Sequence, residues 1–248
     1  MNPANDIRQL TIRAGYGTLA FTITEKDGEV MHYPYTVKSS MSLAANLRQA
    51  FREQPFLNVG EVDKEGKLLV KATLTVVTPV LLIPYERYTD RAEQEKDALY
   101  NDMVTGHKGE TKITTMLESF NSVAMFSVDS DLLLVVTDHC SMVSVDNVMI
   151  PKWNEFYNRY FKSDGKRRLF ACFHDKKVDI FSFAQHRIHF ANSFEAVHAH
   201  DALYYILFVW KQLGFSQEHD TLIIDGQMEH HDWLMTRLKA YVREIETT

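Results

Sequence analysis

The pattern of apolar and polar positions predicts three consecutive strands near the start of the carboxy-terminal third of the chain. Residues 168–174 and 177–184 are rich in aromatic and β-branched residues, and residues 187–196 place apolar side chains on one face at period two. The two-residue gaps 175–176 and 185–186 are the predicted turns. This pattern indicates an antiparallel meander of three strands.

The meander is followed by a predicted helix, a strand and a second helix. Asp201 can cap the first helix, residues 202–210 are all apolar or aromatic, and Gly214 is the expected stop. A helix that is apolar on all sides is expected to be buried on several faces. Residues 221–224 form the next predicted strand. The last helix is predicted from one apolar stripe at helical spacing, formed by Leu234, Leu238, Tyr241 and Ile245.

The amino-terminal part of the chain begins with the same order of elements. Residues 7–14, 18–24 and 29–37 read as three strands, and a helix follows that Ser40 or Ser42 can cap. Three antiparallel strands followed by a helix therefore occur twice in one chain. Such an internal repeat predicts two lobes of similar architecture.

The stretch between the two copies predicts insertions into the first lobe. Residues 88–103 read as a charged, exposed helix, residues 131–137 suit either a buried helix or a strand, and Pro151 can begin another helix. The polar run 163–166 is the expected boundary, with a first lobe at residues 1–163 and a second at residues 164–248. Further strands are predicted at residues 67–77, 80–83, 112–117, 122–127 and 142–145.

Composition is that of an ordinary globular protein, with 45% hydrophobic and 24% charged residues among 248. The net charge of −6 gives no general basic field, and solvated turns explain the short basic runs 166–168 and 176–177, so nucleic-acid binding is not predicted. No signal peptide is visible, and the longest apolar run is too short to span a bilayer. Cys140 and Cys172 are the only cysteines and form no disulfide framework. A cytoplasmic protein is expected.

Three segments carry a resemblance to a known family. They are the run NSFEAVHAHDALYYILFVWKQLG at residues 192–214, the TLIIDG that follows at 221–226, and TPVLLIPYERY at 78–88. With these segments the chain resembles an uncharacterised bacterial family, domain of unknown function 3822. The resemblance covers most of the chain and implies no established activity.

The repeated unit also resembles, more distantly, the superfamily of actin, Hsp70 and the sugar kinases. The cytoplasmic parts of pilus and secretion assembly proteins are built similarly. This resemblance implies an α/β (α+β) chain of two ribonuclease-H-like lobes with a degenerate actin-like ATPase architecture. Fold alone does not fix function, so the chemistry needs its own test.

ATPases of that superfamily carry an aspartate with a nearby glycine at the first strand of each lobe, and paired glycines in the adenosine-binding turn. Here the first hairpin offers Gly15 and Gly17 without a carboxylate, and the second offers Asp175 without a glycine. The adenosine turn would be Asp225-Gly226, with a single glycine. These five residues are the candidate cleft, and because all three turns depart from the pattern, nucleotide hydrolysis is not expected.

Histidines offer the other candidate chemistry. His198, His200 and Asp201, and separately His230, His231 and Asp232, could supply metal ligands, but both groups fall at predicted helix starts, where polar residues cap or face water. We therefore predict no metal site, no cofactor and no catalytic residue.

Two functions remain. The first is a non-catalytic binding or scaffold protein that engages an unidentified protein partner; the second is a nucleotide-dependent phosphoryl transferase with unorthodox ligands. Convergent carboxylates near Asp175 and Asp225 would favour the transferase. An exposed apolar patch or an unpaired edge strand would favour the binding protein.

Overall fold

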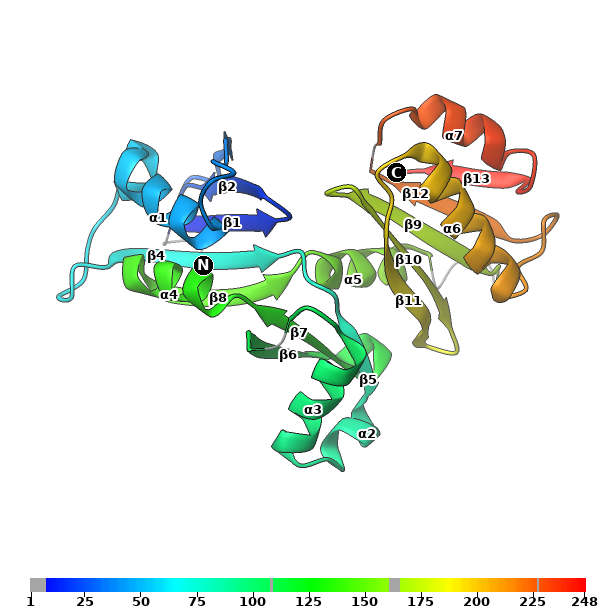
Figure 1. Ribbon diagram of the computed structural model, residues 1–248, viewed down its shortest axis with the longest axis horizontal. Helices are drawn as coiled ribbons and strands as arrows, with labels where there is room; N and C mark the ends of the chain where they lie inside the picture. Colours follow the sequence, from blue (N-terminus) through cyan, green and yellow to red (C-terminus); the bar gives the residue numbers. More distant parts are fainter. Residues whose placement is uncertain (1–7, 108, 161–165, 227) are drawn as a thin grey trace. The chain divides into compact units, whose positions relative to one another are not determined.

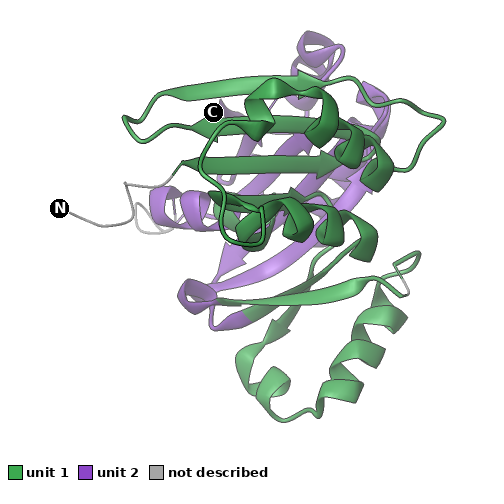
Figure 2. Cartoon of the chain, turned by 90° about the vertical axis from the view of Figure 1, so that its left-hand side faces the viewer, with its two compact units in different colours: residues 1–116, 123–152 green, residues 117–122, 153–248 purple. Residues whose placement is uncertain are grey.

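The chain forms two compact units, each built on its own five-stranded sheet (Figures 1 and 2). The computed structural model describes residues 8–107, 109–160, 166–226 and 228–248. Residues 1–116 and 123–152 make up the first unit, and residues 117–122 and 153–248 the second. The boundary expected between residues 163 and 164 lies outside the described residues.

The sheet of the first unit has the strand order β3-β2-β1-β4-β8. Strands β1, β2 and β3 are antiparallel neighbours, whereas β4 and β8 run parallel to β1. Helices α1 and α4 pack against each other and against this sheet. The Ser42 hydroxyl caps α1 by accepting a hydrogen bond from the Ala45 amide at 3.2 Å. Of the two predicted caps, Ser40 and Ser42, the cap is therefore Ser42. The elements are β1 (Gln9–Gly15), β2 (Thr18–Thr24), β3 (Val30–Tyr35), α1 (Leu43–Glu53), the 3₁₀ turn Pro55–Asn58, β4 (Leu68–Val76), α4 (Ser130–His139) and β8 (Cys140–Asn147).

An insertion between β4 and α4 forms a small sheet of order β5-β7-β6 with its own core. A single charged, exposed helix was expected at residues 88–103, but this stretch belongs to two helices, α2 and α3. Helix α3 is also partly buried. Tyr100 is completely buried, and its hydroxyl donates to the Pro79 carbonyl at 3.1 Å. The ambiguous residues 131–137 are helical, within α4. The insertion comprises β5 (Leu81–Pro84), α2 (Tyr85–Thr89), α3 (Glu93–Met103), β6 (Thr111–Leu117), the 3₁₀ turn Glu118–Phe120 and β7 (Ser122–Val128).

The second unit repeats the sheet of the first. Its strand order is β11-β10-β9-β12-β13, again with three antiparallel strands followed by two parallel ones. The predicted internal repeat of two ribonuclease-H-like lobes is thereby confirmed. The elements are α5 (Met149–Tyr160, shared between the units), β9 (Arg168–His174), β10 (Lys177–Ala184), β11 (Arg187–Glu195), α6 (Ala199–Gln212), β12 (Thr221–Asp225), α7 (His231–Leu238) and β13 (Glu244–Thr247).

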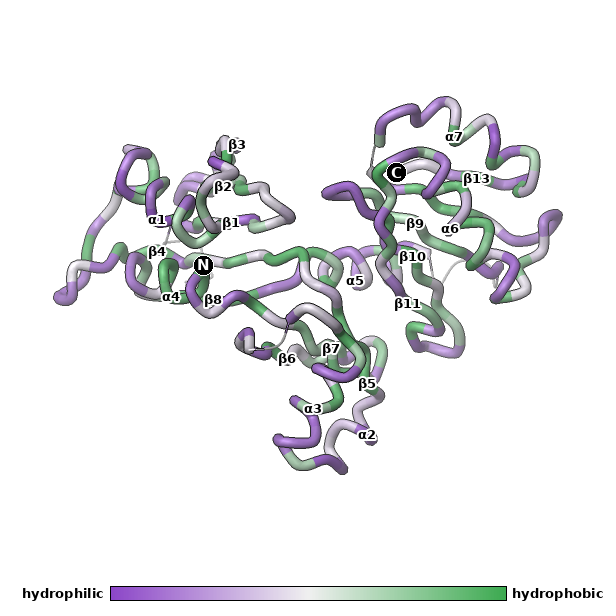
Figure 3. Tube along the Cα trace, in the orientation of Figure 1, coloured by the Kyte–Doolittle hydropathy of each residue, from purple (hydrophilic) through white to green (hydrophobic). Residues whose placement is uncertain are grey.

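Both faces of the second sheet are covered, which explains why β9 and β10 read as nearly continuous apolar runs (Figure 3). On one face, Ile206 of α6 and Leu234 of α7 join the core made by alternate strand residues. On the other face, Phe156 of α5 packs on Phe170 and Phe181, with ring centroids 5.2 and 5.8 Å away. Within the described residues no helix combines the length and the apolar character needed to cross a membrane.

The prediction that the last helix reaches Ile245 is wrong. Leu234 and Leu238 are buried as predicted, but the amides of Tyr241 and Val242 both donate to the Leu238 carbonyl at 2.9 Å and close the helix. The chain then forms β13, in which Ile245 lies beside Leu222 of β12. The pairing with β12 decides the structure of residues 244–247 against the apolar stripe. It gives the backbone amides and carbonyls of this segment hydrogen-bond partners in the sheet.

Helix α6, expected to be buried on several faces, leaves one face exposed. Ile206, Val209 and Trp210 lie in the core, whereas Tyr204 is 62% exposed and Phe208 is 45% exposed. The helix therefore presents an aromatic face outward that its sequence does not distinguish from the buried one.

Candidate functional site

The hairpin between β9 and β10 holds a charged cluster. Asp175 and Lys176 form the predicted two-residue turn, and both have positive φ, 46° and 61°, as a type I′ turn requires. The turn returns the chain so that His174 faces Lys177, with Asp179 two residues further along β10. His174 and Asp179 are therefore diagonal neighbours across the hairpin.

His174 is held by carboxylates at both ring nitrogens. Its Nε2 is hydrogen-bonded to Oδ2 of Asp179, and its Nδ1 lies 3.5 Å from Oδ2 of Asp175. All three side chains are only 12% exposed. Burial lowers the pKa of His174, but the hydrogen bonds and negative charges of Asp175 and Asp179 outweigh burial and raise that pKa to about 9. At neutral pH the imidazole is a cation that neutralises its acidic neighbours.

Asp225 and Gly226 lie at the same edge of the sheet as this hairpin. Strand β12 runs parallel to β9 and pairs Asp225 with Cys172, so both strands end together. Gly226 has a φ of 82°, and a Cβ added to it would lie 2.5 Å from the backbone oxygen of Phe173. The residue is a glycine here because the chain passes directly over the end of β9. Asp225 accepts a hydrogen bond from the Thr248 hydroxyl at 2.8 Å.

The remaining two candidate residues, Gly15 and Gly17, belong to the first unit, in the turn between β1 and β2. Gly15 pairs with Thr18, and Gly17 has a φ of 66° with open space around it. The structure therefore brings Asp175, Asp225 and Gly226 to one sheet edge, while the glycine pair makes a hairpin turn of the other sheet.

Two of the histidines at the helix starts occupy N-cap positions. His198 is the N-cap of α6, and its amide donates to Oδ2 of Asp201 at 3.0 Å in a capping box. His230 is the N-cap of α7. Among the residues that the structure describes, no three His, Cys, Asp or Glu side chains form a group that could hold a metal ion.

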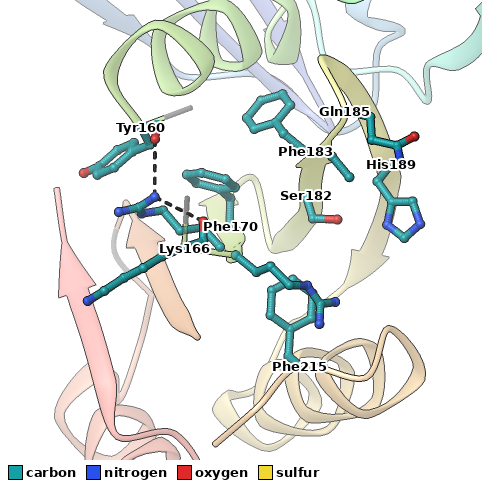
Figure 4. A pocket seen from close by; sticks show the side chains of 11 residues that line it. Tyr160, Lys166, Phe170, Ser182, Phe183, Gln185, His189 and Phe215 are labelled. Carbon is teal, nitrogen blue, oxygen red and sulfur yellow. Dashed lines mark hydrogen bonds between the residues drawn. The ribbon is translucent and has the colours of Figure 1, made fainter. Parts of the chain in front are cut away.

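A cavity of about 320 Å³ opens at the opposite end of β9, in the second unit (Figure 4). Its walls include the rings of Phe170, Phe183 and Phe215. Ser182 also lines it; this residue is 2% exposed, and its hydroxyl has no hydrogen-bond partner among the described residues. Aromatic walls with several polar side chains among them are typical of a site for a small organic molecule.

The basic run 166–168 borders the cavity, and each of its side chains has a structural partner. Lys166 lies 3.0 Å from Glu244, Arg167 donates to the carbonyls of residues 213 and 214 at 2.7 and 2.9 Å, and Arg168 donates to that of Tyr160 at 3.3 Å. These contacts join the run to the ends of α5, α6 and β13.

His174, Asp179 and Ser182 were not among the residues singled out from the sequence. Asp179 and Ser182 interrupt the apolar run 177–184, and this was the signal available in the sequence. A polar side chain in a strand that is buried on both faces needs a hydrogen-bond partner.

Two lobes with this strand order define the actin-like ATPase fold, and solved structures support that class. A Bacteroides thetaiotaomicron protein with actin-like ATPase fold and unknown function matches at a TM-score of 0.84 and 23% identity, covering 99% of this chain and 92% of that one. The structure of the PilM–PilN type IV pilus biogenesis complex matches at 0.56 and 10% identity, covering 98% and 88%. The chain belongs to the family described as Protein of unknown function (DUF3822), which it matches over residues 4–245. No curated protein matches it.

Proposed function

We propose that this protein is a non-catalytic binding protein on an actin-like fold, which engages a protein partner and does not hydrolyse a nucleotide. The observation that carries the proposal is the occupation of the β9–β10 hairpin by His174. This hairpin is the place where a hydrolytic relative would hold a metal-bound phosphate, and here its carboxylates are already engaged by a buried cation.

A magnesium ion needs anionic oxygen ligands in near-octahedral geometry, together with the phosphates it bridges. Asp175 and Asp179 both face the His174 imidazolium, so the metal would have to displace or deprotonate this group. The hairpin has Lys176 and Lys177 at positions where a glycine would let backbone amides approach a phosphate closely. The donor set of the hairpin therefore does not fit a metal-bound phosphate.

The exposed aromatic side chains of α6 support the partner-binding half of the proposal. Tyr204 and Phe208 are adjacent on the helix, and their rings stack with centroids 6.0 Å apart. Aromatic residues are enriched in protein interfaces, where their burial supplies much of the affinity. A protein of the same fold, PilM, is known in a complex with PilN, so this architecture is compatible with such a role.

A phosphoryl transferase with unorthodox ligands is the second candidate function. It is favoured by the shared sheet edge of Asp175 and Asp225, together with the close passage of Gly226 over the end of β9. Phosphoryl transfer needs carboxylates for the metal ion and closely approaching backbone for the phosphates, and this edge offers two acids and a glycine. The ion pairs of His174 count against this function, because they engage the hairpin acids.

Calorimetric titration with Mg·ATP, paired with a phosphate-release assay, separates the two functions. We expect neither magnesium-dependent binding in the micromolar range nor release above the rate without protein, since the hairpin acids are engaged by His174. Asp27→Ala, which removes an exposed acid from the β2–β3 turn, is the control variant. Micromolar binding that is lost in Asp175→Ala and Asp225→Ala but kept in Asp27→Ala would favour the transferase.

A further inference from the structure

The outward face of α6 carries four residues with the spacing of a helix-packing seam. Asp201, Tyr204, Phe208 and Lys211, here called the α6 seam, follow one another at intervals of three, four and three residues. Residues at these intervals lie on one face of a helix. Two exposed aromatic rings therefore occupy the middle of the seam, with an acid near its amino end and a base near its carboxyl end.

The opposite face of α6 fixes the helix to the second sheet. Ala202, Ile206 and Val209 are each at most 1% exposed and belong to the core that also contains β9 and β10. The fold therefore determines which way the seam points, and it gives Tyr204 and Phe208 no role in that core. An apolar pair of this kind on a rigid helix is a surface suited to binding another helix.

The order of residues in the seam is self-complementary. When two copies of a helix pack antiparallel about a twofold axis, each residue faces the residue equally far on the other side of the centre. Both the Tyr204–Phe208 pair and the Asp201–Lys211 pair are centred on position 206. A twofold contact would therefore place each Tyr204 against the partner's Phe208, and would set Asp201 opposite Lys211 at both ends.

We infer that the α6 seam binds the α6 seam of a second copy of this chain in antiparallel orientation. The self-complementary order of charges favours a second copy as the occupant, and it selects the antiparallel orientation because a parallel arrangement would bring like charges together. The same pattern would not favour a membrane surface, which has no alternation of charge to match. The inference rests on the partner-binding half of the proposed function, because it names the partner that Tyr204 and Phe208 bind. It concerns a different surface from the β9–β10 hairpin, so it can fail while the absence of nucleotide hydrolysis holds.

A contact through one helix of each copy is small, so we expect a dimer that dissociates on dilution. Sedimentation velocity over a concentration series measures it directly. The wild-type protein should be largely dimeric at about 100 μM and largely monomeric at about 1 μM, the behaviour of interfaces at the low end of the size range. A wild type that remains monomeric throughout the series would overturn the inference.

The aromatic pair and the charges are tested by separate variants. Tyr204→Ser/Phe208→Ser should abolish the dimer, whereas Met103→Ser, at another exposed apolar side chain in α3, should leave it unchanged. Lys211→Glu and Asp201→Lys should each weaken self-association roughly tenfold, since each creates two like-charge contacts per dimer. An equimolar mixture of these two charge variants should recover the dimer, because every end contact in the mixed dimer then joins opposite charges.

Asp201 also accepts the capping hydrogen bond of His198, so the unfolding temperature of Asp201→Lys is measured alongside. Should that variant not fold, the aromatic variants and Lys211→Glu still decide the matter. A dimer that survives the aromatic double substitution, or a folded charge pair that fails to recover association on mixing, would show that the contact lies elsewhere.

Discussion

Replacing Gly226 with alanine should destabilise the protein by about 3 kcal/mol or more, the upper range for a strained, obstructed backbone position. The residue has a φ of 82°, which side chains other than hydrogen rarely adopt. The added Cβ would also lie 2.5 Å from the Phe173 carbonyl oxygen and 3.4 Å from its carbonyl carbon. Both atoms are backbone of β9, paired within the sheet, so neither can move aside at low cost. Chemical denaturation of the purified variant measures the loss.

Gly66→Ala is the matched control for this prediction. Gly66 has nearly the same φ, 81°, but nothing lies within 4 Å of the position that its Cβ would take. Gly66→Ala should therefore lower the free energy of unfolding only by the cost of a positive φ for alanine, about 1–2 kcal/mol. Equal losses in the two variants would mean that Gly226 does not press on β9, and the description of this sheet edge would need revision.

The unfolding free energy of the wild-type protein should fall as the pH rises from 6.5 to 9, by up to about 3 kcal/mol from His174 alone. The folded state raises the pKa of His174 from 6.5 to about 9, so it binds this proton more tightly than the unfolded chain does. The resulting stabilisation is fully present below pH 6.5 and is lost as the pH rises through 9. Burial raises the pKa of the Cys140 thiol from 9.0 to about 11, so this group adds a loss of stability in the same direction only as the pH approaches and passes 9.

The slope against pH, and not the stability at one pH, identifies the residue responsible. His174→Gln should be less stable throughout, since it leaves Asp179 without its cation, but most of the decline between pH 6.5 and 9 should disappear. His189→Gln, at an exposed histidine of β11, should keep the wild-type slope. If His174→Gln also keeps the wild-type slope of unfolding free energy against pH, the imidazole of His174 is not the group that loses the proton.

Much of the architecture could be predicted from the sequence because the meanders depend on local signals. Runs rich in aromatic and β-branched residues, the alternation in residues 187–196 and the turn at Asp175-Lys176 were enough to predict β9, β10 and β11. The errors arose where tertiary contacts decide between two local patterns. Ile245 continues a helical stripe in sequence, yet β12 recruits it as a strand, and Tyr204 is as apolar in pattern as Ile206 although only Ile206 meets the sheet.

The placement of Asp175 and Asp225 at one edge of the sheet was predictable from the sequence, but the partner of Asp175 was not. Parallel strands that end at one edge bring Asp225 close to the hairpin, which the lobe pattern implies. The partner of Asp175 could not be read in the same way, because a histidine beside an acid in sequence is usually solvated. Burial of His174 and Asp179 on one face of the hairpin turns these residues into an ion pair, and that burial depends on the packing of the whole lobe.

The central claim is that His174 holds the hairpin acids in place of a metal-bound phosphate. An NMR titration of the His174 imidazole against pH, with and without Mg·ATP, tests it most directly. We expect a pKa of about 9 for His174 in both titrations, because nothing displaces Asp175 and Asp179. A pKa that falls toward 6.5 when Mg·ATP is present would mean that a divalent cation has taken these carboxylates and repels the proton, and it would contradict the claim.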